Sequence, residues 1–356
     1  MLSCVFVPPS QNYVDYIDYR VLALLFCLMA VVAGFSSIGV FRILGEKLLK
    51  QVSSLRALEL TLVLLCFFSS MFITNDVALI TFVPFTILIL SMADMLESCI
   101  FLIVMETIAA NLGSMLTPLG NPQNLYLYTV SHMNITEFLG TMLPFSVVSL
   151  LLLTILLFFQ KNEPISLNHS AHNPSDLNSG TISAQKRFFL YLLLFGLCLL
   201  VVLHVLTYQI LLLLVIAGFL IADRRILLEI DYALLLTFLC FFIFIGNLKC
   251  IPQIHTLLSF LLGGHEFIGG ILVSEFISNV PAAILLSGFT GNYKSLLLGV
   301  NTGGLGTLIA SMASLISYKL YVRTAGSQQG KYLLVFTQYN LLFLAVLVAF
   351  YQILGA

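Results

Sequence analysis

Many of the residues that could bind an ion lie in two short polar stretches, each inside a long apolar run. The first is Asn111 to Pro122, NLGSMLTPLGNP, within an apolar run from about 100 to 130. Its glycines and prolines weaken or remove helical hydrogen bonds and so release backbone carbonyls and amides. In hydrocarbon, such groups are tolerated only where they line a cavity or meet a ligand. We therefore interpret this stretch as a broken helix that binds a solute.

A second copy of the stretch lies 190 residues further on, from Asn301 to Met312, NTGGLGTLIASM. The offset pairs Asn111 with Asn301, Gly113 with Gly303, Ser114 with Gly304, Thr117 with Thr307, Gly120 with Ala310 and Asn121 with Ser311. Two broken helices in matching positions of two halves are the best indication in a sequence of a transporter's substrate site.

Two further short polar segments interrupt apolar runs, and we interpret them as the tips of hairpins. Thr74-Asn75-Asp76 divides the run 60–91, and Ser278-Asn279-Val280-Pro281 divides the run 256–289. The arm after the first tip is about 15 residues and the arm after the second is shorter still, whereas a span needs about 20. We therefore expect two re-entrant hairpins, with Asn75 and Asn279 near the middle of the membrane.

The tips and breaks together supply the kinds of group that bind small ions. Half-helix N-termini suit an anion, and amides, hydroxyls and freed carbonyls suit a dehydrated Na⁺. The alternative is that these small polar residues only let helices pack closely. The candidate binding residues are Thr74, Asn75, Asp76, Asn111, Gly113, Ser114, Thr117, Gly120, Asn121, Ser278, Asn279, Asn301, Thr302, Gly303, Thr307 and Ser311.

Three acids lie within apolar stretches, where an ionisable residue is a functional candidate by default. Asp76 is at a hairpin tip, which favours a role in Na⁺ or proton coupling. Glu106 precedes the first break and Glu275 precedes the second tip, so either could carry a proton. The alternative for each is a neutral carboxyl group hydrogen-bonded to a neighbouring helix.

Composition places these residues in a membrane. Hydrophobic residues make up 60% of the 356-residue chain and charged residues 9%, against about 25% charged in a soluble domain. The chain is therefore predicted to be an all-α polytopic membrane protein, and its net charge of −1 gives no reason to expect nucleic acid. His169 and His172 have a ligand-like spacing but lie in a polar segment, so we expect neither a metal site nor a cofactor.

The elements that position these residues are also duplicated. Ile17-Asp18-Tyr19 opens one apolar span and Ile230-Asp231-Tyr232 opens another, at an offset of 213. We expect a first repeat over 1–160, a polar linker over 161–186 and a second repeat over 187–356. Together these would hold about eight spans, two re-entrant hairpins and two broken helices. The unbroken spans are expected at about 17–44, 138–159, 187–204, 208–222, 231–248 and 332–354.

The distribution of basic residues predicts the orientation, because cytoplasmic loops carry an excess of Lys and Arg. With both termini outside, twelve basic residues fall in inner loops: Arg42, Lys47, Lys50, Arg56, Lys161, Lys186, Arg187, Arg224, Arg225, Lys319, Arg323 and Lys331. Three remain outside: Arg20, Lys249 and Lys294. This arrangement puts Asp18 outside and Asp231 inside, so the two repeats are expected to be inverted with respect to each other.

These motifs resemble a known group. TND-V-A at Thr74, N-x-G-x-x-x-T-P-x-G-N-P at Asn111 and SN-V-P-A at Ser278 are similar to the ion transporter superfamily, in its citrate-transporter-like branch with arsenite permeases and NhaD-type antiporters. The resemblance covers about residues 17–355. It implies a secondary transporter of elevator type, usually dimeric. We expect the protein to lie in the plasma membrane. By matching motif, the implied site residues are Thr74 to Asp76, Asn111 to Asn121, Ser278-Asn279 and Asn301 to Thr307.

One feature departs from that group. Two helices, at about 187–222, precede the second Ile-Asp-Tyr start, whereas only residues 1–16 precede the first. Members of the group usually have both pairs, so we expect the first repeat to lack its N-terminal helices.

The function predicted from these residues is secondary active transport of a small anion, dicarboxylate, citrate-like or an inorganic oxyanion, coupled to Na⁺ or H⁺. Na⁺/H⁺ antiport and arsenite-type permeation are the alternatives within transport, since no Arg lies near a tip or break. From another class, the chain could be a membrane enzyme or an assembly subunit. The lack of a catalytic cluster counts against the enzyme, and the duplicated polar site counts against the passive subunit.

Overall fold

The computed structural model describes residues 7, 12–40, 52, 54–93, 95–160, 162–164, 181–203, 205–324 and 326–355. Over these ranges the chain is all-α, as predicted, and the single β-bridge joins Ser54 to Pro164. Some residues used for the sequence predictions lie outside the described part: Arg42, Lys47, Lys50, Lys161, His169, His172 and most of the linker 161–186.

Eight helices in the described part are long and apolar enough to cross a membrane. They are α3 (Tyr19–Ser37), α5 (Leu55–Ile73), α6 (Asn75–Met92), η1 with α7 (Leu96–Ser114), α9 (Ile135–Phe158), the Gln185–Val202 part of α10 (Thr181–Val202), α12 (Tyr232–Lys249) and α18 (Gln329–Leu354). The number agrees with the prediction, but the membership differs. Helices α5 and α6 each have the length of a span, whereas α11 (Tyr208–Ala222) is a shorter apolar helix of 15 residues.

The repeated Ile-Asp-Tyr motif is a helix start in both places. The Asp18 carboxylate accepts a hydrogen bond from the Val21 amide at 3.0 Å, and Asp231 accepts one from the Leu234 amide at 2.9 Å. Each aspartate thereby satisfies one of the free amides in the first turn of its helix. The negative charge also suits the positive end of the helix dipole.

The same order of elements occurs twice. In the first half it is α3, the pair α5 and α6, then α7 (Cys99–Ser114), α8 (Pro122–Ser131) and α9. In the second half it is α12, the pair α14 (Glu266–Ile277) and α15 (Asn279–Ser287), then α16 (Tyr293–Thr302), α17 (Met312–Val322) and α18. One additional helix, α13 (Pro252–Leu262), follows α12. The two predicted helix breaks lie between α7 and α8 and between α16 and α17.

The two hairpins differ in their arms. The second has a short second arm, as expected: α15 has nine residues. Its first arm is bent by 112° between 256–262 and α14. The first hairpin does not match the expectation of a 15-residue second arm, because α6 has 18 residues. The helix begins at Asn75, so most of the polar tripeptide forms its first turn instead of a loop.

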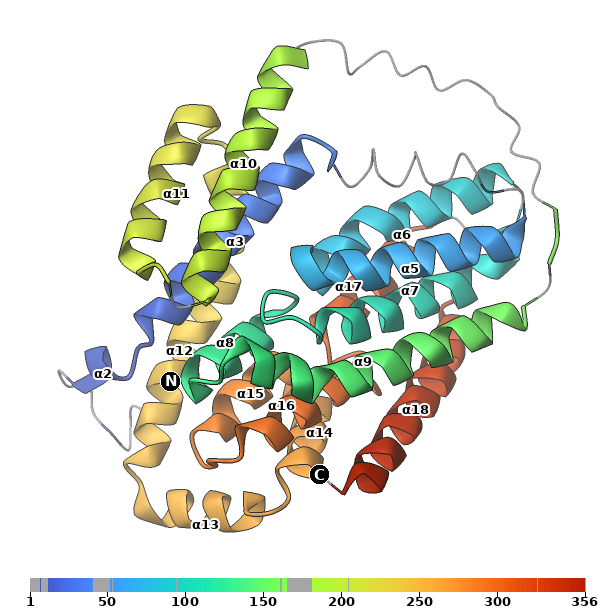
Figure 1. Cartoon of the computed structure of the whole chain (residues 1–356). Helices are drawn as coiled ribbons and strands as arrows, with labels where there is room; N and C mark the ends of the chain where they lie inside the picture. Colours follow the sequence, from blue (N-terminus) through green and yellow to red (C-terminus); the bar gives the residue numbers. More distant parts are fainter. Residues whose placement is uncertain are drawn as a thin grey trace.

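The helices form two groups in space (Figure 1). Helices α10 and α11 pack against α3 on one side of the molecule, while α5, α6 and α7 lie together with α17 on the other. Gly34 allows a close approach in the first group, since a Cβ there would lie 3.1 Å from the Phe219 ring and 3.2 Å from the Tyr191 ring. Helices α8, α14, α15 and α16 lie below the second group, and α9 and α18 run alongside it.

Glycines set the distance between each hairpin and its broken helix. A Cβ on Gly113 would lie 2.1 Å from the Phe67 carbonyl oxygen, and one on Gly303 would lie 2.7 Å from Ile271 Cα. Phe67 and Ile271 are equivalent at the 204-residue offset of the hairpins, so the same close contact occurs in both halves. Such approach of backbones is what small residues allow between membrane helices.

We expect Gly113→Ala to destabilise the protein, because the added methyl group would meet backbone atoms of α5 that cannot move aside. Overpacking of this kind costs about 1–3 kcal/mol. The measurement is thermal unfolding of the purified protein in detergent. Gly140→Ala in α9 is the matched control, because nothing lies within 4 Å of a Cβ at that position. An unfolding temperature as little changed by Gly113→Ala as by Gly140→Ala would contradict the proposed contact.

Candidate functional site

Each hairpin tip is fastened to the helix break of its own half by one backbone hydrogen bond. The Asn75 amide donates to the Gly120 carbonyl at 3.2 Å, and the Asn279 amide donates to the Ala310 carbonyl at 2.9 Å. Asn75 and Asn279 correspond at an offset of 204, and Gly120 and Ala310 at an offset of 190. The two halves therefore form the same contact between equivalent residues.

The residue before each tip asparagine has the same unusual backbone. Thr74 has φ 69° and ψ 150°, and Ser278 has φ 75° and ψ 153°. Positive φ is uncommon for a residue other than glycine, and it costs free energy that the surrounding structure must offset. Two turns of this kind at equivalent positions show that the tips have a defined shape that positions the asparagines which follow.

Two threonines of the breaks reach back to the hairpins. Thr117 Oγ1 donates to the Met71 carbonyl, and Thr307 Oγ1 donates to the Glu275 carbonyl at 3.2 Å. Met71 and Glu275 are again equivalent at the 204-residue offset. The threonines predicted as binding residues thus hold the last turn of each hairpin's first arm against the break.

The two halves meet through two asparagines, Asn111 and Asn301. Asn111 Oδ1 accepts from Asn75 Nδ2 at 3.0 Å and from Ser311 Oγ at 2.9 Å. Its Nδ2 lies 3.4 Å from Ser314 Oγ and 3.5 Å from the Gly304 carbonyl. One residue therefore contacts the tip of its own half and the break of the other.

Asn301 makes the corresponding contacts in the opposite direction. Its Oδ1 accepts from Asn121 Nδ2 at 3.1 Å, and its Nδ2 donates to Asn124 Oδ1 at 2.7 Å. At the 190-residue offset Asn121 corresponds to Ser311, and Asn124 corresponds to Ser314. The cross-half contacts are thus reciprocal. We call these residues the central cluster: Asn75, Asn111, Asn121, Asn124, Asn301, Ser311 and Ser314.

The central cluster is buried and consists of amides and hydroxyls. None of its residues is more than 5% exposed. Within the described chain, no Lys, Arg or His side chain hydrogen-bonds to a member of the cluster. Ser114 adds a further contact to the cluster, because its hydroxyl accepts a hydrogen bond from Asn121 Nδ2 at 3.2 Å. Buried polar groups of this density persist only when they are hydrogen-bonded to each other or to a ligand.

Four helices begin at or beside the cluster. They are α6 at Asn75, α8 at Pro122, α15 at Asn279 and α17 at Met312. Asn121 caps α8 through the Asn124 amide at 2.9 Å, but α6, α15 and α17 have no side-chain cap. Free amides and the positive ends of helix dipoles favour negative charge. The site is therefore suited to an anion although no basic side chain belongs to the cluster.

The remaining predicted site residues lie close to the cluster in different ways. Thr302 is buried in the last turn of α16, and Ser278 Oγ lies 3.4 Å from the Ala310 carbonyl. Gly113 and Gly303 lie at the close contacts between hairpin and broken helix, so their role is to let these helices pack closely. Gly120 is also crowded, because a Cβ there would lie 2.0 Å from the Ser114 carbonyl oxygen.

The three acids occupy different surroundings. Asp76 is in the first turn of α6, and its buried Oδ1 has no hydrogen-bond partner. Glu275 accepts from the Thr307 amide at 2.8 Å through Oε2, while its buried Oε1 has no partner. Glu106 accepts a hydrogen bond at 2.5 Å from Thr86, which lies eleven residues after Asn75 on α6. Asp76 and Glu275 thus flank the two tips, and Glu106 is separate.

Sequence reasoning missed Asn124 and Ser314. Both lie in the first turn of a helix that follows a break, just past the end of the polar stretch. The 190-residue offset that pairs the breaks also pairs these two residues, and extending the comparison by one helical turn would have found them.

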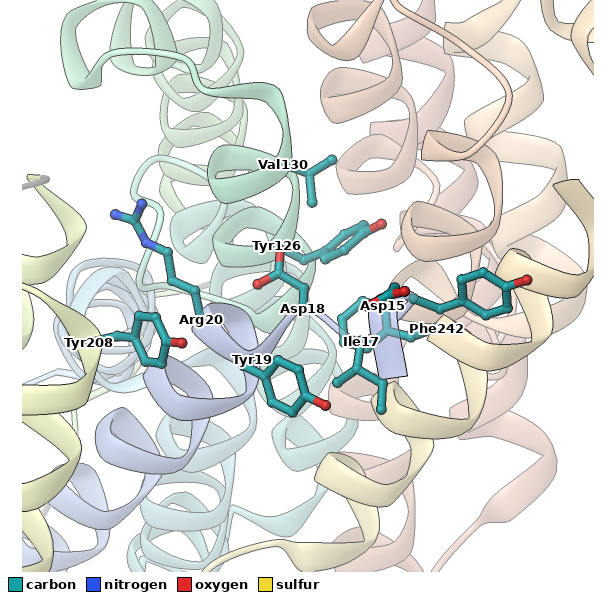
Figure 2. Close-up of a pocket in the computed structure, with 10 residues that line it drawn as sticks. Asp15, Ile17, Asp18, Tyr19, Arg20, Tyr126, Val130, Tyr208 and Phe242 are labelled. Atoms are coloured by element: carbon teal, nitrogen blue, oxygen red, sulfur yellow. The ribbon is translucent and has the colours of Figure 1, made fainter. Parts of the chain in front are cut away.

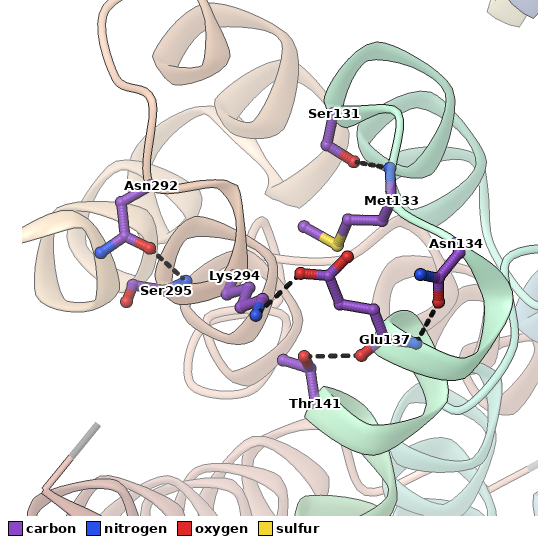
Figure 3. Close-up of polar contacts among 8 residues, drawn as sticks. All are labelled: Ser131, Met133, Asn134, Glu137, Thr141, Asn292, Lys294 and Ser295. Atoms are coloured by element: carbon purple, nitrogen blue, oxygen red, sulfur yellow. Dashed lines mark hydrogen bonds and ion pairs between the residues drawn. The ribbon is translucent and has the colours of Figure 1, made fainter.

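Two open cavities lie outside the central cluster. One, of about 480 Å³, lies between the start of α3 and α8 and includes Asp18, Arg20 and Tyr126 (Figure 2). The other, of about 460 Å³, lies beside the ion pair of Lys294 Nζ with Glu137 Oε1 at 2.8 Å (Figure 3). That exposed pair joins the first turns of α9 and α16, and pairs of this kind contribute little stability.

The described residues contain no group of three or more His, Cys, Asp or Glu side chains that could hold a metal ion. The oxygen-rich cluster could instead contact a monovalent cation through amide, hydroxyl and backbone oxygens. The expectation that no cofactor is needed stays a prediction.

The fold and the cluster define a class: a polytopic helical membrane protein with paired hairpin tips and helix breaks. Residues 1–292 match the model of the citrate transporter family, CitMHS. The chain belongs to this family, which is part of the ion transporter superfamily, and the resemblance drawn from its motifs is confirmed. Family and relatives together point to a transporter that spans a membrane.

The relatives carry general names. The chain is 33% identical over 339 residues to the uncharacterized transporter MJ0456 of Methanocaldococcus jannaschii, covering 95% of this chain and 90% of the relative. It is 32% identical to the inner membrane protein YbiR of Escherichia coli, covering 88% and 83%. It is also 34% identical over 128 residues to the silicon efflux transporter LSI3 of rice, Oryza sativa, covering 36% and 26%.

Proposed function

We propose that this protein is a secondary active transporter that moves a small anion, coupled to Na⁺ or H⁺. The observation that carries the proposal is the convergence of four helix N-termini on the buried central cluster. The starts of α6, α15 and α17 have no side-chain cap. The Asn75, Asp76 and Asn279 amides already have partners, but the positive ends of these helix dipoles still favour an anion, as at many helix N-termini. Asp76 and Glu275 flank the same cluster, where carboxylates could bind the coupling cation.

The proposal extends to how the protein works. The reciprocal contacts of Asn111 and Asn301 support two inverted repeats that share one site near the membrane middle. In that arrangement both termini would lie outside, the hairpins would be re-entrant, and the two tips would open alternately. The transporter would work in the plasma membrane and, by the resemblance described above, as a homodimer with an elevator-type movement.

A second candidate function is Na⁺/H⁺ antiport. It is favoured by the unpartnered carboxylate oxygens of Asp76 and Glu275, since a group that alternately holds Na⁺ and a proton must be free of other partners. An uncharged oxyacid is a related candidate, because the cluster lacks a basic side chain and one relative is named a silicon efflux transporter.

The test is uptake into proteoliposomes that contain the purified protein. Citrate, succinate, sulfate, arsenite and silicic acid would each be offered under an imposed Na⁺ gradient, an imposed pH gradient or neither. We expect one anion to accumulate only with a gradient, and only in liposomes that contain the protein. Gradient-driven Na⁺/H⁺ exchange without any of these solutes would replace the proposal by the antiporter. Accumulation of none of them, together with no exchange, would refute both.

A further inference from the structure

Charged and aromatic side chains meet in the cavity of about 480 Å³ beside the start of α3 (Figure 2). The cavity lies between the segment that leads into α3, the helix α8, the first turn of α11 and α12. Its charged lining residues are Asp15, Asp18 and Arg20, and the rest of its lining is aromatic or aliphatic. None of these three belongs to the central cluster, so the transport site does not account for them.

The three charges of the cavity are not paired with one another. The ion pairs in the described part of the chain join other residues, and the Asp18 and Arg20 side chains lie apart in Figure 2. Arg20 donates from Nη2 to the Val201 carbonyl at 3.1 Å, and its other N–H groups have no partner among the described residues. Asp18 accepts from the Val21 amide through Oδ1, and its Oδ2 accepts from no described residue. Both groups therefore keep hydrogen-bonding capacity for a ligand.

Aromatic rings form much of the cavity wall. The aromatic lining residues are Tyr16, Tyr19, Tyr126, Tyr208 and Phe242. The Tyr126 hydroxyl is already paired with Ser287 Oγ at 2.7 Å, so Tyr126 offers its ring to the cavity. The Asp18 carboxyl group lies near this ring (Figure 2). A carboxylate beside an aromatic ring attracts an ammonium group through its charge and through the cation–π interaction.

The charges of the cavity favour a ligand that carries both signs. A simple anion would meet Arg20 but also two carboxylates, and a simple cation would meet the carboxylates but also the guanidinium group. Either ligand would therefore face repulsion as well as attraction. A zwitterion satisfies both sides, because a phosphate accepts paired hydrogen bonds from a guanidinium group and an ammonium group donates to carboxylates.

The surroundings of the cavity suit a membrane lipid. The cavity lies at the first turn of α3, which is long and apolar enough to span the membrane, and so at one end of a spanning helix. Exposed apolar side chains adjoin it: Tyr19 is 48% exposed, Val14 beside Asp15 is 57% exposed, and Val205, three residues before Tyr208, is 72% exposed. Tyrosines are enriched at the membrane–water interface, where lipid headgroups lie. The charged interior thus matches a headgroup, and the apolar surroundings match its acyl chains.

We propose that this cavity binds a membrane phospholipid whose headgroup joins a phosphate to a primary ammonium group, as in phosphatidylethanolamine. Arg20 binds the phosphate, while Asp18 and the Tyr126 ring bind the ammonium group. The proposal goes beyond transport and does not depend on which solute is moved. Tyr126 lies on α8, two residues after Asn124 of the central cluster. The lipid therefore connects the helix that carries part of the central cluster with the group formed by α3, α10 and α11.

The test is native mass spectrometry of the purified protein in detergent, with phosphatidylethanolamine or phosphatidylglycerol added. The two lipids carry the same acyl chains and the same phosphate, but phosphatidylglycerol lacks the ammonium group. We expect the wild type to bind phosphatidylethanolamine about tenfold more tightly, which is the factor for one hydrogen bond to a charged group. Equal binding of the two lipids by the wild type would overturn the proposal.

Two variants test the contacts one at a time. Asp18→Asn removes the negative charge but keeps the helix cap, because asparagine caps helices as well as aspartate does, and we expect it to abolish the preference between the two lipids. Asp231→Asn is the matched control, since Asp231 makes the same cap at the start of α12 and does not line the cavity. Arg20→Gln should weaken phosphatidylethanolamine binding about tenfold, whereas Arg225→Gln, at an exposed position, should not. An unchanged preference in Asp18→Asn, or unchanged binding in Arg20→Gln, would overturn the proposal.

Glycerophosphoethanolamine distinguishes a membrane lipid from a water-soluble ligand, because it is the same headgroup without acyl chains. We expect phosphatidylethanolamine to stay bound when this compound is present at the same concentration, since the acyl chains add apolar contacts around the cavity. Displacement of the lipid under these conditions would overturn the assignment to a membrane phospholipid.

Discussion

Replacing Asn301 by alanine should abolish transport while the protein still folds. Asn301 Oδ1 accepts from Asn121, and its Nδ2 donates to Asn124 and to the Leu297 carbonyl at 2.8 Å. Alanine leaves the amides of Asn121 and Asn124 without these partners. Each buried polar group left unpaired costs about 1–3 kcal/mol. Because Asn121 caps α8 and Asn124 lies in its first turn, we expect the loss to disturb the start of this helix at the site.

The measurements for Asn301→Ala are uptake in proteoliposomes and, separately, the unfolding temperature and monodispersity in detergent. Asn340→Ala is the matched control. Asn340 is also a fully buried asparagine, but its amide bonds to Phe336 within its own helix, α18. We expect it to lose some stability and to keep transport. Normal uptake by Asn301→Ala would remove the cross-half contact from the mechanism. Loss of uptake in both variants would indicate a general effect on folding.

The second large effect is expected for Asp76→Asn, which distinguishes a symporter from an antiporter. If Asp76 binds Na⁺ beside an anion, the substitution should raise the Na⁺ concentration needed for uptake. Some anion binding should remain, because the uncapped starts of α15 and α17 are unchanged. If the protein is instead a Na⁺/H⁺ antiporter, exchange should stop, since an amide side chain does not titrate in the working pH range.

Two measurements separate these outcomes: Na⁺ binding by calorimetry, and Na⁺/H⁺ exchange in vesicles under a pH gradient. Glu97→Gln is the control, because it also removes one carboxylate but at an exposed position before α7. Exchange in the wild type without any anion, lost only in Asp76→Asn, would establish the antiporter. Unchanged Na⁺ dependence in Asp76→Asn would exclude Asp76 from the cation site and direct attention to Glu275.

Much of the architecture follows from the sequence for local reasons. An apolar run of span length predicts a membrane helix wherever it occurs, and glycine, proline or asparagine inside the run predicts a break. Asp18 and Asp231 begin their helices because a carboxylate can cap the amides three residues on. The correspondence of Asn111 with Asn301 is visible as a repeat. None of these inferences needs knowledge of which segments touch.

The length of α6 shows where local reasoning fails. The polar tripeptide at the first tip reads as a loop, which leaves an arm of about 15 residues. In the structure the chain bends at Thr74 alone, and Asn75 and Asp76 already belong to the helix. What holds that turn is the bond from the Asn75 amide to the Gly120 carbonyl, which comes from a segment 45 positions away in the sequence.

The tertiary structure alone decided which polar residues form the site and which pack helices. Asn111 meets Ser311, and Asn301 meets Asn121, across sequence separations of 200 and 180 residues. Gly113 and Gly303, from the same stretches, allow the close contact with the hairpins instead. Residue type and spacing do not distinguish a binding residue from a packing residue, because a small or polar side chain can serve either role. The role depends on the neighbour that the fold brings near, and only the packing of distant segments determines that neighbour.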